Sequence, residues 1–189
     1  MVFGVPWLDG PTALAVVVSC SGDVRLFTTV ANPVVRGPAA LAKVLAGLDV
    51  LSGGRVTAGL GPGSSGRDYP TVGVPFQERW PRFDEAVVAL RALLSGGSFT
   101  GRFYAVDGPL EPLPVQPKGP PLWVGSWGSD AGLGRAIRLG DGWLASSRNG
   151  LRGRRVDRDQ EAGPGRARRA WFADTGRAVE EHVVPAGSG

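Results

Sequence analysis

The chain has 189 residues, 42% of them hydrophobic and 20% charged, which is enough for one globular domain with a core. A single cysteine and a single histidine exclude a disulfide framework and a metal site built from histidine ligands. The net charge of +4 comes mainly from arginines in residues 148–169, and no apolar run is long enough for a membrane span, so we expect a cytoplasmic protein without a membrane partner.

Helices and strands are predicted in alternation up to residue 147. The first helix begins near Pro11 and continues through an apolar stretch to Cys20, which we expect to be a small buried residue. Pro38 opens a second helix, in which leucines and valines recur at the spacing of one buried face. The full set comprises strands at residues 24–30, 55–60, 122–125 and 142–146, helices at residues 39–51, 76–94 and 131–139, and an extended segment at residues 102–106.

This alternation is typical of a parallel sheet covered by helices, so the predicted fold class is α/β. The strands are largely apolar runs that do not alternate cleanly between apolar and polar residues, as expected for strands with both faces buried. The pattern stops after Ser147. The arginine- and glycine-rich residues 148–189 are therefore expected to form an irregular, poorly ordered C-terminal tail.

Three predicted strands lead into segments rich in glycine and hydroxyl side chains, at residues 28–32, 59–66 and 125–129. Ligands of parallel α/β folds bind at the carboxyl ends of strands, and the amide groups at a helix start favour a phosphate. Each segment alone is also compatible with a plain turn. The residues after Gly59 match neither a dinucleotide fingerprint nor a phosphate-binding loop with Gly-Lys-Ser or Gly-Lys-Thr. The convergence of three such segments predicts a binding site.

A connected set of motifs resembles the luciferase-like monooxygenases, a family of flavin- or deazaflavin-dependent oxidoreductases. Residues 48–56 read LDVLSGGRV and residues 59–63 read GLGPG, which is similar to the same region of that family. Further similar segments, in the same order, are residues 73–79, 83–85, 99–104, 120–125 and 140–143. Order and spacing agree from about Pro11 to Ser147, and the style is closest to the deazaflavin-dependent branch.

The resemblance implies a (β/α)8 TIM barrel that binds FMN or a deazaflavin coenzyme of the F420 type in its mouth. Such an enzyme acts on a small-molecule substrate by hydride transfer or oxygen activation. A complete barrel needs roughly 250 residues, and family members have two more strands before the position of Pro11 and two more after Ser147. We therefore expect a partial barrel, with residues 1–147 as an incomplete core and the chain truncated at both ends.

The resemblance also implies which residues bind the cofactor. Thr28, Thr29 and Val30 would lie against the flavin ring, with a non-prolyl cis peptide bond between Thr29 and Val30. The other implied residues are Gly61 and Gly63 lining the mouth, Arg67 pairing with a phosphate or polyglutamate tail, Gly125, Ser126, Trp127 and Gly128 holding the phosphate, and Ser146 closing the site. No catalytic acid or base and no metal ligand is assigned. Trp143 is expected to serve in packing.

Three functional hypotheses are compatible with these residues. The first is an active oxidoreductase. The second is an inactive, truncated or frameshifted remnant of one, whose short sheet has exposed edges that can pair with a second copy as a homo-oligomer. The third is nucleic-acid binding, which depends only on the arginine-rich tail and lacks interleaved aromatic residues, so nucleic acid is not an expected partner.

Overall fold

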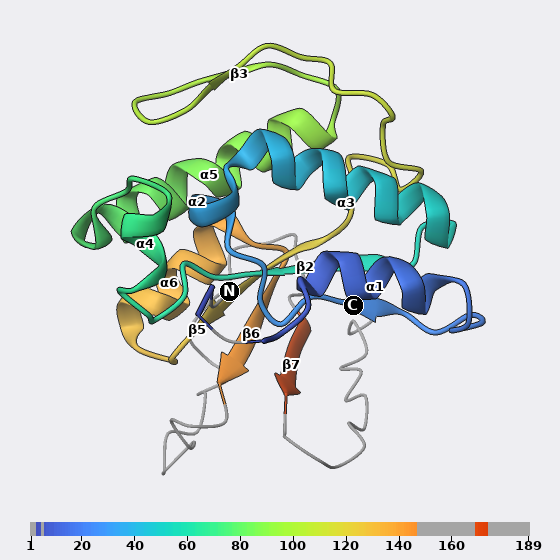
Figure 1. The fold of residues 1–189 in the computed structure, drawn as a ribbon, viewed down its shortest axis with the longest axis horizontal. Coiled ribbons are helices and arrows are strands. Elements are labelled where there is room, and N and C mark those ends of the chain that lie inside the picture. Colours follow the sequence, from blue (N-terminus) through green and yellow to red (C-terminus); the bar gives the residue numbers. More distant parts are fainter. Residues whose placement is uncertain (1–2, 5, 147–168, 174–189) are drawn as a thin grey trace, which may run out of the picture.

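The computed structural model describes residues 3–4, 6–146 and 169–173. Its centre is a parallel sheet in the strand order β1-β2-β5-β6-β7, which curls like part of a barrel (Figure 1). The strands are β1 (Leu26–Phe27), β2 (Val56–Leu60), β5 (Leu122–Ser126), β6 (Gly142–Ser146) and β7 (Arg169–Ala173). The register places Ala58 beside Leu122 and Val124 beside Trp143. The predicted α/β class with a partial barrel sheet is confirmed.

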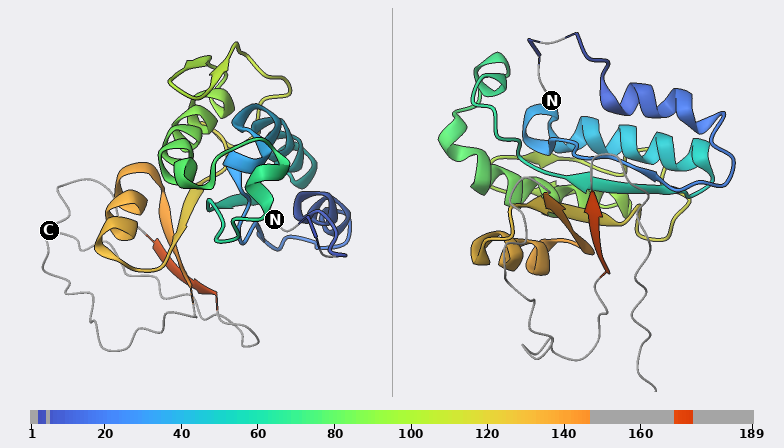
Figure 2. Two further views of the ribbon diagram at one scale, coloured as in Figure 1. Left: turned by 60° about the vertical axis from the view of Figure 1, so that its left-hand side comes forward. Right: turned by 90° about the horizontal axis from the view of Figure 1, so that it is seen from below.

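The main helices lie on one side of this sheet and follow one another around it (Figure 2). They are α1 (Gly10–Val18), α3 (Pro38–Ser52), α5 (Arg79–Leu94) and α6 (Asp130–Leu139), joined by the short helices α2 (Pro33–Arg36), α4 (Asp68–Thr71) and the 3-10 helix η1 (Phe76–Glu78). Neighbours in this row contact each other, α1 with α3, α3 with α5, and α5 with α6. Within the described ranges, no helix is long and apolar enough to cross a membrane.

The hydrophobic core lies between the sheet and this layer of helices. Leu41 and Leu45 of α3 and Leu90 of α5 are fully buried, together with Leu60 of β2 and Val124 of β5. Leu41 and Leu45 are one helical turn apart, which puts both side chains on the face that meets the sheet. The periodicity that predicted the helix therefore also predicted its buried side for Leu41, Leu45 and Leu48, whereas Leu51, which belongs to the same pattern, is 67% exposed.

The turn from α3 to β2 is fixed by the Ser-Gly-Gly-Arg segment. The helix ends at Ser52 and is capped by Gly53, which has a left-handed φ of 65° that glycine adopts without steric cost. Arg55 donates to the carbonyl oxygens of Ser52 and Val24, both at 2.8 Å, and to Ser21 Oγ at 2.9 Å. One guanidinium group thus joins the end of α3 to the segment that precedes β1, at the amino end of the sheet.

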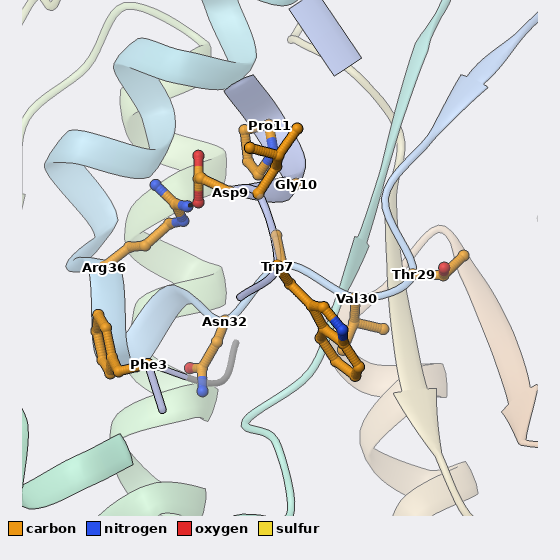
Figure 3. Close-up of a pocket in the computed structure, with 11 residues that line it drawn as sticks. Phe3, Trp7, Asp9, Gly10, Pro11, Thr29, Val30, Asn32 and Arg36 are labelled. Carbon is orange, nitrogen blue, oxygen red and sulfur yellow. Dashed lines mark ion pairs between the residues drawn. The ribbon is translucent and has the colours of Figure 1, made fainter. Parts of the chain in front are cut away.

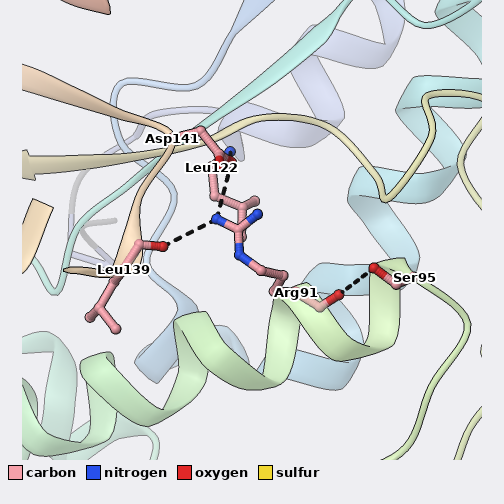
Figure 4. A network of polar contacts seen from close by, with 5 residues as sticks. All are labelled: Arg91, Ser95, Leu122, Leu139 and Asp141. Atoms are coloured by element: carbon pink, nitrogen blue, oxygen red, sulfur yellow. Dashed lines mark hydrogen bonds and ion pairs between the residues drawn. The ribbon is translucent and has the colours of Figure 1, made fainter. Parts of the chain in front are cut away.

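Asp141 links three segments at the same end of β5. Its Oδ2 accepts a hydrogen bond from Leu122 N at 2.9 Å and pairs with Arg91 of α5 at 3.0 Å (Figure 4). Arg91 also donates to the carbonyl oxygen of Leu139, the last residue of α6, at 3.1 Å. These bonds fix the start of β5 and the turn that leads from α6 into β6.

Several boundaries differ from the predictions. Strand β1 comprises only Leu26–Phe27, because the chain leaves the regular ladder and returns to β2 through a single bridge from Ala31 to Leu60. The predicted extended segment 102–106 is mostly the turn of a hairpin, with Gly101 N donating to Tyr104 O at 2.8 Å between β3 (Phe99–Thr100) and β4 (Ala105–Val106).

Other features were not predicted at all. The short helices α2 and α4 were missed, and β7 lies inside the segment that was expected to be an irregular tail. The rest of residues 148–189 lies outside the described residues. The expectation that Cys20 is buried was wrong, because α1 ends at Val18 and Cys20 stands exposed in the turn that follows.

Candidate functional site

The loops that follow β1, β2 and β5 meet at one edge of the sheet, because these strands are parallel neighbours. Backbone hydrogen bonds connect the first two loops directly. Ala31 N donates to Gly59 O at 2.8 Å, and Gly61 N donates to Ala31 O at 3.0 Å. The structure therefore brings together the three segments that the sequence singled out.

The peptide bond between Thr29 and Val30 is cis, as the family resemblance implied. The half-buried Val30 side chain lies over two glycines from neighbouring strand ends. A Cβ added at Gly61 would lie 2.9 Å from Val30 Cγ2, and one added at Gly125 would lie 3.1 Å from Val30 Cγ1. The absence of a side chain at both glycines allows this close approach, which is tightest at Gly61. Val30, Gly61 and Gly125 thus form one packed group at the barrel mouth.

The two threonines before Val30 have different surroundings. Thr28 is buried, and its hydroxyl donates to Gly59 O at 2.9 Å, so it holds the loop onto β2 from below. Thr29 is exposed and lines a cavity. Of the two predicted hydroxyl groups, only that of Thr29 is free to meet a ligand without breaking a bond to the backbone.

The segment between β5 and α6 contains the predicted phosphate-binding residues. Ser126 is buried, and its Oγ accepts a hydrogen bond from Trp143 Nε1 at 3.0 Å. Gly128 has a φ of 69° and packs against the same indole, since an added Cβ would lie 3.5 Å from Trp143 Cζ2. Ser129 caps α6 by accepting from Gly132 N at 3.2 Å. Trp143 therefore packs beneath this turn, as expected.

The remaining predicted residues are less closely packed. Trp127 is 67% exposed, and Arg67 is exposed at the end of the loop after β2. Within the described residues the Arg67 guanidinium makes no ion pair. The backbone N–H of Arg67 donates a hydrogen bond to Ser65 Oγ at 3.3 Å. Gly63 follows Pro62 with a φ of 72°. Ser146 ends β6, and its side chain lies outside the described part of the structure.

A cavity of about 410 Å³ opens beside the Thr29–Val30 peptide bond (Figure 3). Its lining comes from the N-terminal segment, the start of α1, the loop after β1 and the end of α2, namely Phe3, Trp7, Leu8, Asp9, Gly10, Pro11, Thr29, Val30, Ala31, Asn32 and Arg36. Arg36 and Asp9 form an ion pair across one wall. Burial lowers the pKa of the Arg36 guanidinium, and the adjacent Asp9 carboxylate offsets its charge. The cavity therefore combines the aromatic side chains of Phe3 and Trp7 with an ion pair whose two opposite charges cancel.

Sequence reasoning missed the residues that this N-terminal segment contributes, and it also missed Tyr69. It included Asn32 in the segment 28–32 at a strand end, but it did not predict that Asn32 caps the start of α2 and bonds to Pro62. Asn32 Nδ2 donates to the carbonyl oxygen of Pro62 at 2.7 Å, and the Tyr69 hydroxyl donates to the same oxygen. The available signal for Asn32 was the Asn-Pro pair, which is typical of a capped helix start as well as of a strand end. Across the described ranges, no group of His, Cys, Asp or Glu side chains is suited to hold a metal ion.

With this geometry in place, comparison with known proteins identifies the family. Residues 2–173 match the luciferase-like monooxygenase family. The chain belongs to this family. An F420-dependent hydroxymycolic acid dehydrogenase of Mycobacterium tuberculosis is 35% identical over 150 residues, which cover 76% of this chain and 40% of that protein. An F420-dependent glucose-6-phosphate dehydrogenase of Beutenbergia cavernae is 35% identical over 153 residues, covering 77% and 43%.

The fold is also similar to that of a solved structure. The crystal structure of the monooxygenase RslO1 from Streptomyces bottropensis superposes with a TM-score of 0.66 at 31% identity, covering 72% of this chain and 42% of that chain. The chain thus spans less than half the length of each of these three proteins. The sequence resemblance to the luciferase-like family is confirmed.

Proposed function

We propose that the chain forms the cofactor-binding part of a luciferase-like oxidoreductase and binds coenzyme F420, with FMN as the alternative, at the carboxyl ends of β1, β2, β5 and β6. The observation that carries this proposal is the Val30 side chain, which lies over Gly61 and Gly125 beside a cis peptide bond. This arrangement offers a rigid apolar surface at the mouth of a parallel sheet, where ligands of such folds bind.

Thr29 and Val30 would contact the flat ring system of the cofactor, while Thr28 holds their backbone against Gly59. Gly61 and Gly63 would let the loop after β2 come close to the cofactor. The geometry of this group fits a planar ring, because the Val30 side chain fills the space over the glycines of two strand ends and offers an apolar surface against which a ring could pack.

The polar end of the cofactor would lie at the turn between β5 and α6. Residues Gly125, Ser126, Trp127 and Gly128 lead into the start of α6, where the positive end of the helix dipole favours a phosphate group. Arg67 would pair with a phosphate or a carboxylate tail from the next loop, and Ser146 would close the site at β6. These residues bind and orient, and none is proposed as a catalytic acid or base.

When bound, the cofactor supplies hydride transfer or oxygen activation, and the chain orients it and shields it from water. The cavity beside Thr29 is of a size suited to a small organic substrate. Two relatives at 35% identity are F420-dependent dehydrogenases, which favours F420 and hydride transfer over FMN and oxygen activation.

Equilibrium titration of the purified chain with F420 and with FMN, followed by cofactor fluorescence, tests this proposal. We expect saturable binding of one cofactor with a Kd on the order of micromolar, weakened in the Gly125→Val variant, whose side chain would collide with Val30. Binding of neither cofactor, together with non-cooperative unfolding in urea, would instead support the inactive remnant. The expected homo-oligomer and the cytoplasmic location stay predictions, and light scattering tests the first.

A further inference from the structure

The carbonyl oxygen of Pro62 accepts hydrogen bonds from two side chains that come from different parts of the chain. Asn32 Nδ2 donates at 2.7 Å from the start of α2, and the Tyr69 hydroxyl donates from α4. Asn32 is 5% exposed and Tyr69 is 0% exposed. A carbonyl oxygen has two lone pairs, so these two donors complete its hydrogen bonding in an environment shielded from water.

Both donors are themselves held in place. Asn32 Oδ1 caps α2 by accepting from Val34 N at 3.0 Å and from Val35 N at 3.2 Å. The amide is thereby oriented with Nδ2 toward Pro62. The Tyr69 ring packs edge-to-face on Phe76, with centroids 5.2 Å apart. Neither the Asn32 amide nor the Tyr69 ring can move without losing these contacts.

Pro62 lies at the centre of the loop that we propose to line the cofactor site. Gly61 packs under Val30, and Gly63 turns the chain with a φ of 72° and leaves only 3.3 Å between an added Cβ and Asn32 Nδ2. Because proline has no N–H, its carbonyl oxygen is the one backbone group through which hydrogen bonds can fix this residue. Two side-chain donors on that oxygen therefore determine where the loop lies.

We infer that Asn32 and Tyr69 are positioning residues, a clamp on Pro62 that holds Gly61 and Gly63 at the distance from Val30 that the cofactor requires. This inference rests on the proposed function. Neither side chain touches the reacting atoms, since both act through the Pro62 carbonyl group. The clamp adds a second side-chain link between the loops after β1 and β2, beside the backbone bonds at Ala31 and the bond from the Thr28 hydroxyl to Gly59 O.

The test uses the full chain with Tyr69→Phe, Asn32→Asp and the double variant, each titrated with F420 and FMN. Tyr69→Phe keeps the ring packing and removes one donor, whereas Asn32→Asp keeps the helix cap and removes the other. Tyr104→Phe is the matched control, because the Tyr104 hydroxyl is buried but has no hydrogen-bond partner of normal geometry in the described residues. Melting temperatures are recorded for all variants.

We expect each single variant to bind the better cofactor about fivefold more weakly, the usual effect of one hydrogen bond. The double variant should lose more than the product of the two, because it leaves a buried carbonyl group without a partner. Tyr104→Phe should bind like the unaltered chain. The clamp is contradicted if the variants melt at lower temperature but bind with unchanged affinity, which is the result of a purely structural role.

Failure of the proposed function gives a different result. An unaltered chain that binds neither cofactor contradicts the function and, with it, any effect of the clamp on affinity. Hydrogen exchange at the Gly61 amide, which donates to Ala31 O, then measures the clamp alone. Faster exchange in the double variant than in the unaltered chain supports an ordering role for the clamp, and equal exchange overturns it.

Discussion

Replacing Gly59 by alanine should destabilise the fold by displacing the loop that carries the cis peptide bond. An alanine Cβ at this position would lie 2.6 Å from Phe27 Cε1 and closer still to the carbonyl oxygen of Thr28. Carbon atoms pack best at about 3.5–4.0 Å, so the overlap with the ring alone is about 1 Å. The Thr28 oxygen belongs to the backbone and cannot rotate away. Overpacking of this kind costs about 1–3 kcal/mol, and we expect the upper end.

Urea unfolding of Gly59→Ala beside Gly47→Ala measures this effect against a matched control. Gly47 lies inside α3, and a Cβ there meets nothing within 4 Å, so the same substitution should stabilise the chain by about 0.5–1 kcal/mol through the better helix propensity of alanine. Opposite signs for the two variants are the expected result. If Gly59→Ala proved as stable as the unaltered chain, the described packing of β1 against β2 would be wrong.

Three further substitutions and conditions should have measurable effects on the free energy of unfolding. Arg55→Ala should lower it by about 1–3 kcal/mol, since several charged hydrogen bonds to partly buried oxygens are lost, which thermal or urea unfolding can check. Asp141→Ala should lower it by about 1–3 kcal/mol in the same assay, because Leu122 N at the start of β5 loses its acceptor. Burial raises the pKa of Tyr69 and Tyr104 above their ordinary value of 10.0, because the folded state favours the neutral hydroxyl groups. Their contribution to the free energy of unfolding is therefore complete below that value and decreases as the pH rises through their folded-state pKa values. Urea midpoints between about pH 8 and about pH 11 should fall less in the Tyr69→Phe/Tyr104→Phe double variant than in the unaltered chain, and equal decreases would contradict the assignment.

The local spacing of apolar residues predicted those helices and strands whose apolar side chains are buried in the core. The spacing of Leu41 and Leu45 predicted α3 and its buried face, and the apolar run around Val56 predicted β2. The family resemblance predicted the cis bond between Thr29 and Val30, which no periodicity indicates. The same loops of glycine and hydroxyl residues that the sequence singled out do meet at one edge of the sheet.

What the sequence did not predict depends on contacts between distant residues. Phe3 N donates to Asp68 Oδ1 at 3.1 Å across 65 positions, and this bond ties the N-terminal wall of the cavity to α4. Asn32 meets Pro62 across 30 positions. Neither bond leaves a local signature, because each requires the chain to have folded. The prediction that Cys20 is buried was wrong for a related reason. Its apolar flanks indicated burial, but α1 ends at Val18, before Cys20.

Amide chemical-shift mapping of the isotope-labelled chain with F420 and with FMN tests the central claim most directly. We expect one cofactor to shift the amides of Thr29, Val30, Gly61 and Gly128 most, in the loops at the carboxyl ends of β1, β2 and β5. Amides near Arg55, at the opposite end of the sheet, should be unaffected. Shifts concentrated around Arg55, or none with either cofactor at saturating concentration, would contradict it.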